Sequence, residues 1–331
     1  MVNNGLATLG SYYYSCLTTG QRHLYDSLLL GIRKMSTKVL LPIRPINEIA
    51  RIFDCIQYDH PDIFHVAGFS QSNDAYKKKC TIKPEYKYTP SFVNEKKKIV
   101  GEYLRRFDAV KMLSDYEKEL HIHDHCLENF SYDHAKDEYA NSLLGCVLNG
   151  RAVCEGIAKF VKLVSDYVGL ENVYVTGKAA DPARDGRAEN HAWNIVKIDG
   201  EYFHLDATFD MTIMDKDKRY DYFNLSDGDI KKDHAISVDA PVCRVEGKDY
   251  YSRNGLVLKT PKALELFIGN NLINGISKMV FKLPGTKNSD KVVEKVRAIA
   301  LRRYMDIYKR DVAIRYSLNQ SQMVFEIEYS R

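Results

Sequence analysis

The chain has 331 residues, 45% of them hydrophobic, so it can bury a substantial core in one large or two to three small domains. It carries 48 lysine and arginine residues against 44 aspartate and glutamate residues, a net charge of +4. This small, scattered excess gives no reason to expect nucleic acid as a partner. No apolar run approaches the length of a membrane span, so none is expected in this chain.

The N-terminal residues 1–17 do not resemble a signal peptide, because they lack a basic start and Asn, Gly and Ser interrupt their apolar residues. The location is therefore unknown: the chain by itself is cytoplasmic by sequence, and export after removal of a leader is the alternative. The seven cysteines (16, 55, 80, 126, 146, 154 and 243) form an odd set without a Cys-x-x-Cys pair. This pattern predicts reduced thiols rather than a disulfide framework.

Residues 20 to 110 predict a mixture of helices and short strands. Apolar residues at helical spacing predict helices around 24–32 and 46–56, and short apolar runs predict strands at 38–42 and 63–69.

A long surface helix is predicted over residues 94–113, which are rich in charge. Ser114 and Glu117 then form a capping-box pattern that predicts the start of another helix at 115.

Cys154 lies in the stretch NGRAVCEGIAKF, between a glycine-marked turn and apolar residues that recur at helical spacing as far as Val168. Gly169 supplies the end of this predicted helix. Free N–H groups and the positive end of the helix dipole at a helix start favour a thiolate over a thiol. A small apolar residue in a packed position is the alternative explanation.

Residues 190–210 predict two alternating strands joined by Asp199 and Gly200, a strong two-residue hairpin signal. If the turn contains only these two residues, Ile198 faces Glu201. The register of the whole hairpin follows from that pair. The polar segment 178–190 before it is either a substrate gate or a plain connection.

In this register Asp206 lies opposite Trp193 and diagonally across from His191, on the same face of the hairpin. Diagonal neighbours are roughly 7–8 Å apart at the backbone, which allows a hydrogen bond between a histidine and a carboxylate. If the register differs, Asp210 is the alternative partner.

Cys154, His191 and Asp206 together have the composition of a thiol triad, in which histidine takes the thiol proton and aspartate orients the ring. Taken singly, the last two are also explained as a hydrogen-bonded strand histidine and a strand-end carboxylate. Their joint occurrence with the cysteine favours catalysis.

Three motifs, VCEGIAKF, HAWN and YFHLDATFD, occur in the order seen in the transglutaminase-like superfamily of papain-type thiol enzymes, which the sequence resembles, specifically in its bacterial branch. The segment LSDYEKELHIHDHCLENFSYD also resembles the helix that precedes the core in that family. The resemblance covers roughly residues 113–225. It implies an α+β fold in which the cysteine helix packs on an antiparallel sheet, with Cys154, His191 and Asp206 as the triad. The segments on either side of this core are expected to form small α/β domains.

Departures from the family concern the residues around the triad. Phe209 stands where the family commonly has tryptophan, which implies a change of packing. No match exists for the family's side chain that completes the oxyanion hole, so Tyr132 is the candidate, with a core tyrosine as the alternative. Trp193, the only tryptophan, is the candidate aromatic wall of the substrate site.

The resemblance implies acyl transfer from peptide or side-chain amides of a protein or peptide substrate, without a cofactor. Hydrolysis is favoured over crosslinking of glutamine to lysine because few aromatic walls are visible. A non-catalytic module that binds peptide or cell-surface polymer is the rival hypothesis. The sequence contains no acidic loop of EF-hand type, so nothing in it suggests a calcium site.

The run HIHDHC suggests a metal site, but His121 and His125 share one helix face while His123 points away. Since no third ligand is evident nearby, no metal is expected. Exposed helix residues, or one histidine packed near the core, explain the run.

Residues from about 245 onward predict a separate α+β unit. Helices are expected at 262–270 and 290–308, and strands at 278–283, 312–318 and 323–329. The expected division is an N-terminal α/β domain (1–110), a transglutaminase-like catalytic core (111–242) and a C-terminal α+β domain (243–331).

Overall fold

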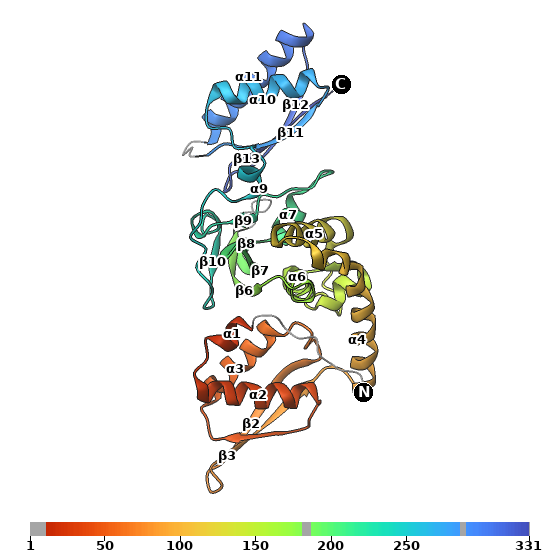
Figure 1. The fold of residues 1–331 in the computed structure, drawn as a ribbon, viewed down its shortest axis with the longest axis vertical. Helices are drawn as coiled ribbons and strands as arrows, with labels where there is room; N and C mark the ends of the chain where they lie inside the picture. The colour runs from red at the N-terminus through yellow and green to blue at the C-terminus, as the bar shows by residue number, and fades with distance from the viewer. Residues whose placement is uncertain (1–10, 181–186, 285–288, 331) are drawn as a thin grey trace.

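The computed structural model describes residues 11–180, 187–284 and 289–330. Three sheets of three or more strands follow one another along the long axis of the molecule, each accompanied by helices (Figure 1). Every strand pair in these three sheets is antiparallel. The fold is therefore of the α+β class, as the sequence predicts.

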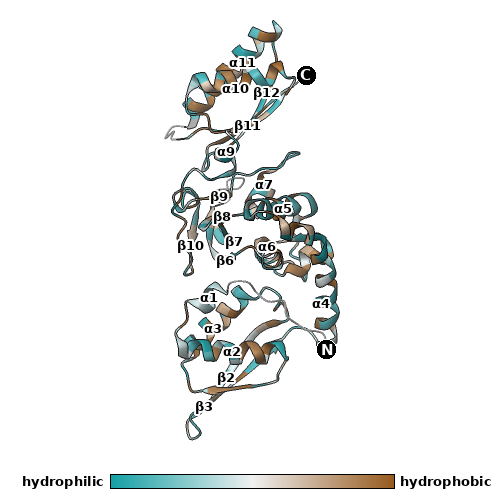
Figure 2. Cartoon of the chain, viewed as in Figure 1, coloured by the Kyte–Doolittle hydropathy of each residue, from teal (hydrophilic) through white to brown (hydrophobic). Residues whose placement is uncertain are grey.

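The N-terminal sheet has the order β1-β3-β2. Its strands and the helices packed with them are β1 (Val39–Pro42), β2 (Val66–Asp74), β3 (Lys79–Tyr86), α1 (Tyr12–Ser15), α2 (Thr19–Arg33) and α3 (Ile46–Asp59). Figure 2 shows hydrophobic and hydrophilic residues mixed along α2, as expected for a helix with one buried face. Strand β3 was not predicted: Cys80, Ile82 and Pro84 are its buried residues, and a proline within a run weakens a strand prediction.

The connection to the centre of the molecule begins with α4 (Pro90–Leu104) and continues as two 3₁₀ turns, 105–107 and 109–112. The predicted single helix over 94–113 is therefore wrong in its second half. Since 3₁₀ structure repeats every three residues, the turns bring both Phe107 and Val110 into the core. The next helix, α5 (Asp115–Asn129), begins at the predicted capping box of Ser114 and Glu117.

The central sheet has the order β10-β6-β7-β8-β9. Its strands are β6 (Asn172–Ala180), β7 (Ala188–Ile198), β8 (Glu201–Leu205), β9 (Phe223–Leu225) and β10 (His234–Ile236). Helix α6 (Cys154–Val168) packs on β6 and β7. Val196 and Ile198 join the core around α6, whereas Trp193 and Ile195 join the core formed with the N-terminal helices. The predicted arrangement of a cysteine helix on an antiparallel sheet is confirmed.

The β7–β8 hairpin has the predicted register, with Ile198 opposite Glu201 across Asp199 and Gly200. Both turn residues have positive φ, 53° and 87°, as the tight turn requires. The second strand is shorter than predicted, because Asp206 caps a helix, α7 (Ala207–Ile213), in place of continuing the strand.

Short elements complete the centre: β4 (Ser131–Tyr132), a π-helical turn at 145–149, β5 (Arg151–Ala152), α8 (Asp227–Ile230) and α9 (Tyr250–Arg253). Residues 181–186, within the polar segment that precedes the hairpin, lie outside the described part of the chain. The described ends of β6 and β7 pair with each other, Ala180 opposite Ala188.

The C-terminal sheet, of order β11-β13-β12, has a core of its own. Its elements are α10 (Pro261–Ile273), β11 (Lys278–Lys282), α11 (Ser289–Tyr308), β12 (Ile314–Asn319) and β13 (Val324–Tyr329), close to the predicted ranges. The three-domain division stays a prediction, and one core is shared between N-terminal residues and strands β6 and β7. Among the described residues, helices long and apolar enough to cross a bilayer are absent.

Candidate active site

Cys154 is the first residue of α6, and its position follows from the local chain path. The preceding strand β5 pairs in parallel with β4, which places Ala152 beside Tyr132. The N-cap residue, Val153, gives no side-chain hydrogen bond to the helix start. The N–H groups of the first turn therefore receive no cap from that residue and lie next to the thiol.

Gly156 lets the start of α6 approach the preceding chain closely. A Cβ atom there would lie 2.5 Å from the carbonyl oxygen of Ala140 and 2.8 Å from that of Ser142. Any larger residue at this position would push the helix start, and with it Cys154, away from its neighbours.

His191 and Asp206 are in direct contact, as the hairpin register predicts. Nε2 of His191 lies 2.6 Å from Oδ2 of Asp206. The other carboxylate oxygen accepts hydrogen bonds from the backbone N–H groups of Thr208 (3.0 Å) and Phe209 (3.1 Å). Because Nε2 is engaged by Asp206, Nδ1 is the ring nitrogen left for the thiol of Cys154.

The electrostatics of His191 and Asp206 favour the charged forms of both side chains. Burial alone would lower the pKa of His191, but the Asp206 carboxylate and the Cys154 thiol raise it to about 10. Burial likewise opposes ionisation of Asp206, but the two neighbouring imidazoles of His191 and His234 hold its pKa well below the usual range. At neutral pH the histidine is therefore an imidazolium and the aspartate a carboxylate.

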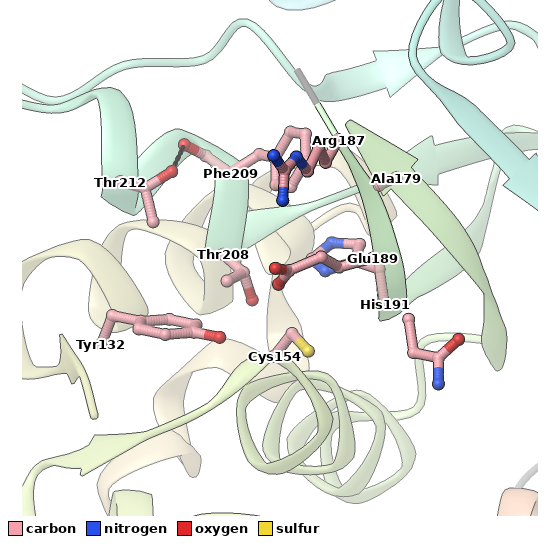
Figure 3. A pocket seen from close by; sticks show the side chains of 10 residues that line it. Tyr132, Cys154, Ala179, Arg187, Glu189, His191, Thr208, Phe209 and Thr212 are labelled. Atoms are coloured by element: carbon pink, nitrogen blue, oxygen red, sulfur yellow. Dashed lines mark hydrogen bonds between the residues drawn. The ribbon is translucent and has the colours of Figure 1, made fainter. Parts of the chain in front are cut away.

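A cavity of about 50 Å³ opens at these residues (Figure 3). Its lining consists of Tyr132, Cys154, Ala179, Arg187, Glu189, Asn190, His191, Thr208, Phe209 and Thr212. Arg187, Glu189 and Asn190 are exposed at its rim. These three rim residues were not predicted, since nothing in their spacing distinguishes them from other polar residues.

Tyr132 lies on the wall of this cavity, and in Figure 3 its hydroxyl points toward the space between Thr208 and Cys154. The parallel pairing of β4 with β5 holds it there. The position is compatible with the oxyanion-hole role expected from the sequence.

Trp193 does not wall the substrate site, so that prediction is wrong. Its side chain is 1% exposed and stacks on the His191 ring with centroids 5.9 Å apart. Its Nε1–H donates to Nδ1 of His204 at 3.1 Å, a bond that fixes it in the core. The aromatic residue that lines the cavity beside His191 is Phe209, with ring centroids 4.7 Å apart.

The alternative partner Asp210 does not contact His191. Its Oδ2 lies 3.0 Å from Nε2 of His123, a fully buried histidine. His123 is thus the one packed histidine of the HIHDHC run, while His121 is exposed and His125 contacts the hydroxyl of Tyr103 at 2.8 Å.

Two groups of side chains in the described part of the chain are close enough to share a metal ion. One consists of His191, Asp206 and His234, and the other of His204, Asp227 and Cys243. In the second group Nδ1 of His204 accepts the Trp193 N–H, so Nε2 carries the proton and donates to Asp227 at 3.0 Å. In the first group, Nε2 of His191 and Nε2 of His234 both donate to Asp206. In neither group, therefore, do these histidine nitrogens direct a lone pair at a shared ion.

His234 is a further residue of the site that the sequence does not predict. Its Nε2 lies 3.1 Å from Oδ2 of Asp206, the atom that also meets His191. The contact depends on the pairing of β10 with β6. These two strands are far apart in the chain, so no local spacing rule predicts their pairing. An Asp-His pair opening the short apolar stretch after Lys232 is the only local signal.

The seven cysteines are all free, in agreement with the prediction of reduced thiols. Cys16 is exposed, Cys154 is partly exposed, and the other five are buried. Two thiols are therefore within reach of a reagent, and only Cys154 has a histidine beside it.

Comparison with known proteins places residues 107–207 in a match to the model of the transglutaminase-like superfamily. The curated proteins contain no match. Among solved structures, a TGase is similar over 46% of this chain with 15% identity and a TM-score of 0.32. A candidate cysteine protease from Cytophaga hutchinsonii is similar over 43% of this chain with 13% identity and a TM-score of 0.27. The matched parts span 47% and 62% of those two chains.

Proposed function

Because residues 107–207 match the model of the transglutaminase-like superfamily, we propose that this protein is a thiol-dependent acyl-transfer enzyme acting on peptide or side-chain amides. Its triad consists of Cys154, His191 and Asp206. The observation that carries the proposal is the contact of His191 with Asp206 on one side and with the Cys154 thiol on the other. Cys154 and His191 both line an open cavity.

In the first half-reaction the Cys154 thiolate attacks the amide carbonyl carbon, and the carbonyl oxygen becomes an oxyanion. Collapse of this intermediate breaks the C–N bond, and the leaving nitrogen takes the proton from Nδ1 of His191. A thioester remains on Cys154, and His191 is neutral. Asp206 keeps the Nε2–H oriented throughout.

The oxyanion is stabilised by the backbone N–H of Cys154 at the start of α6 and by the hydroxyl of Tyr132. Preorganised donors of this kind usually give the largest single contribution to acyl transfer. The uncapped helix start and the position of Tyr132 on the cavity wall support this assignment.

In the second half-reaction His191 takes a proton from water, the resulting hydroxide attacks the thioester carbon, and the acid and the Cys154 thiolate are released. We favour water over a lysine amine as acceptor. The cavity lining is mostly polar, and Tyr132 and Phe209 are the only aromatic side chains among its described residues. Crosslinking of glutamine to lysine is the second candidate, and a non-catalytic binding module is the third.

Alkylation kinetics test the proposal on the full chain. Dilute iodoacetamide at neutral pH should label Cys154 first, because it begins a helix and the His191 imidazolium lies beside it. Cys16 is the internal control, since it is more exposed but has no histidine partner among its described contacts. His191→Ala should slow labelling of Cys154 and leave Cys16 unchanged. Equal rates at both thiols, unaffected by this substitution, would refute the triad.

A further inference from the structure

The Asp206 carboxylate has a second imidazole partner. His234, at the start of β10, is 4% exposed, and its Nε2 lies 3.1 Å from the same Oδ2 atom that meets His191. Gly177 in β6 permits this approach, because a Cβ there would clash with the carbonyl oxygen of Ala235. The geometry is therefore built by the pairing of β10 with β6.

Both ring nitrogens of His234 face carboxylates. Nδ1 lies 2.6 Å from Oδ1 of Asp233, and Oδ2 of Asp233 accepts a hydrogen bond from the Tyr222 hydroxyl at 2.7 Å. Burial and the adjacent Asp233 raise the pKa of Tyr222, so the hydroxyl keeps its proton and acts as the donor. Because Asp233 accepts from Nδ1 and Asp206 accepts from Nε2, His234 needs a proton on each nitrogen.

The surroundings of His234 support the imidazolium form. Burial opposes its charge, but the hydrogen bonds to Asp206 and Asp233 raise its pKa above the ordinary value. Of the other titratable groups that face it, His191 is cationic, with ring centroids 5.5 Å apart. Burial lowers the pKa of His204, which is neutral and accepts the Trp193 N–H. Two carboxylates, Asp206 and Asp233, thus flank His234, and the cationic His191 ring lies on the other side of Asp206.

We propose that His234, held as an imidazolium by Asp233, is a positioning residue that shares the Asp206 carboxylate with His191 and thereby eases release of the His191 proton. A single carboxylate oxygen with two cationic donors binds each of them less strongly than it would bind one. The positive charge of His234 also disfavours a second positive charge on His191. During amide cleavage the proton passes from Nδ1 of His191 to the departing nitrogen, while His234 keeps both of its protons.

The catalytic meaning of this inference rests on the proposed function, but the proton equilibrium does not, so the two can be tested separately. The test uses the full chain with ¹³C-labelled histidine ring carbons and the substitution Cys154→Ala, which removes the sulfur group that helps to hold the His191 proton. The titration midpoint of the His191 ring is then followed by NMR. His234→Gln should raise that midpoint by about one pH unit, since charges at such distances shift a pKa by about 1–3.

Two carboxamide variants serve as a matched pair. Asp233→Asn should shift the His191 midpoint in the same direction by less, because it weakens the hold on the His234 proton. Asp227→Asn removes a carboxylate from another buried histidine, His204, which has no hydrogen bond to Asp206, and should leave the midpoint unchanged. Gln at 234 can still donate to Asp206, so a purely structural role predicts no rise.

An unchanged or lowered midpoint in His234→Gln overturns the inference. If that variant does not fold, Asp233→Asn decides alone, and no shift there overturns it equally. Iodoacetamide labelling of Cys154 in the unsubstituted chain reports separately on the proposed function. A shifted midpoint without selective labelling would retain the shared carboxylate and reject the thiol enzyme.

Discussion

Nε2 of His191 and Oδ2 of Asp206 lie 2.6 Å apart, although His191 is inside a strand and Asp206 is the N-cap of a helix. The same carboxylate therefore orients an imidazole and begins α7. The backbone N–H groups of Thr208 and Phe209 both donate to Oδ1 of Asp206. The backbone therefore fixes the orientation of the carboxylate that holds His191.

Replacement of Asp206 by asparagine separates these two roles. Asparagine is also a good N-cap, so α7 should form and the fold should persist. The amide no longer fixes the tautomer of His191, and turnover should fall by about 10⁴-fold. Circular dichroism and the rate of amide cleavage measure the two effects.

Asp210→Asn is the matched control for this experiment. Asp210 lies one helical turn further along and pairs with His123 rather than His191. The variant should keep its activity and lose about 1–3 kcal/mol of unfolding free energy, because a buried imidazole loses its carboxylate. If Asp210→Asn abolishes turnover while Asp206→Asn does not, the assignment of the aspartate is wrong.

The parts of the site that the sequence predicts depend on local geometry. Asp199 and Gly200 select a two-residue turn, and that turn determines which residues of β7 and β8 face each other. The start of α6 is likewise marked by apolar spacing and by Gly169, which adopts the left-handed conformation at the helix end. These are short-range rules, so one sequence suffices for them.

The parts that the sequence does not predict depend on contacts between distant segments. His234 reaches Asp206 only through the pairing of β10 with β6. Trp193 lies on the same strand face as His191, as expected, but the N-terminal helices cover that face, so the side chain is in the core and not at the substrate site. Alternation along a strand identifies which residues share a face and not what covers them.

Stability should show a pH window that comes from the His191–Asp206 pair. The pKa of His191 is raised from 6.5 to about 10, so its contribution is complete below pH 6.5 and is lost as the pH rises toward 10. The pKa of Asp206 is depressed below 3.8, so its contribution is complete above that value and is lost at lower pH. Urea unfolding should show the largest difference between the wild type and His191→Gln from about pH 4 to 6.5.

The control for this window is His125→Gln. Burial lowers the pKa of His125, so its native neutral form becomes unfavourable when the pH falls below 6.5. The stability advantage of the wild type over this variant should therefore shrink at low pH. A His191→Gln difference that instead grows between pH 7 and pH 10 would contradict the ion pair.

Tyr132→Phe tests the oxyanion-hole assignment. Loss of one donor at such a site typically lowers turnover by about 10²–10³-fold. Alkylation by iodoacetamide forms no tetrahedral oxyanion, so the labelling rate of Cys154 should stay close to that of the wild type. Equal loss in both assays would mean that Tyr132 supports the thiol or the fold instead.

The C-terminal residues should be dispensable for thiol chemistry, but the position of the cut matters. The Tyr251 hydroxyl donates to Asp221 at 2.8 Å, and Val245 and Tyr250 pack against the central core. A chain ending at residue 255 keeps these contacts and should still label at Cys154. It loses the bond from Asn319 to Asp221, at 3.0 Å, and should be less stable by about 1–3 kcal/mol.

A chain ending at residue 240 is the comparison, and it should be markedly less stable than the chain ending at 255. If even the chain ending at residue 255 is insoluble at every temperature, the C-terminal sheet is part of the catalytic unit. The predicted boundary between residues 242 and 243 would then be wrong.

The acceptor of the acyl group should be water more often than an amine. Transfer to an amine requires a site that excludes water and admits a lysine-like side chain. Here the rim of the cavity carries exposed Arg187, Glu189 and Asn190, and the only tryptophan is buried behind His191. Water therefore has access to the thioester, and no aromatic tunnel through the described residues guides an amine to it.

The assay offers a glutamine peptide together with a fluorescent primary amine, and compares ammonia release with amine incorporation. Ammonia should exceed incorporated amine even when the amine is present at millimolar concentration, and Cys154→Ala should abolish both products. Incorporation that outruns hydrolysis would make the protein a crosslinking enzyme. If Cys154 labels rapidly but neither product forms from varied peptides, the thiol is activated for a substrate class other than glutamine side-chain amides.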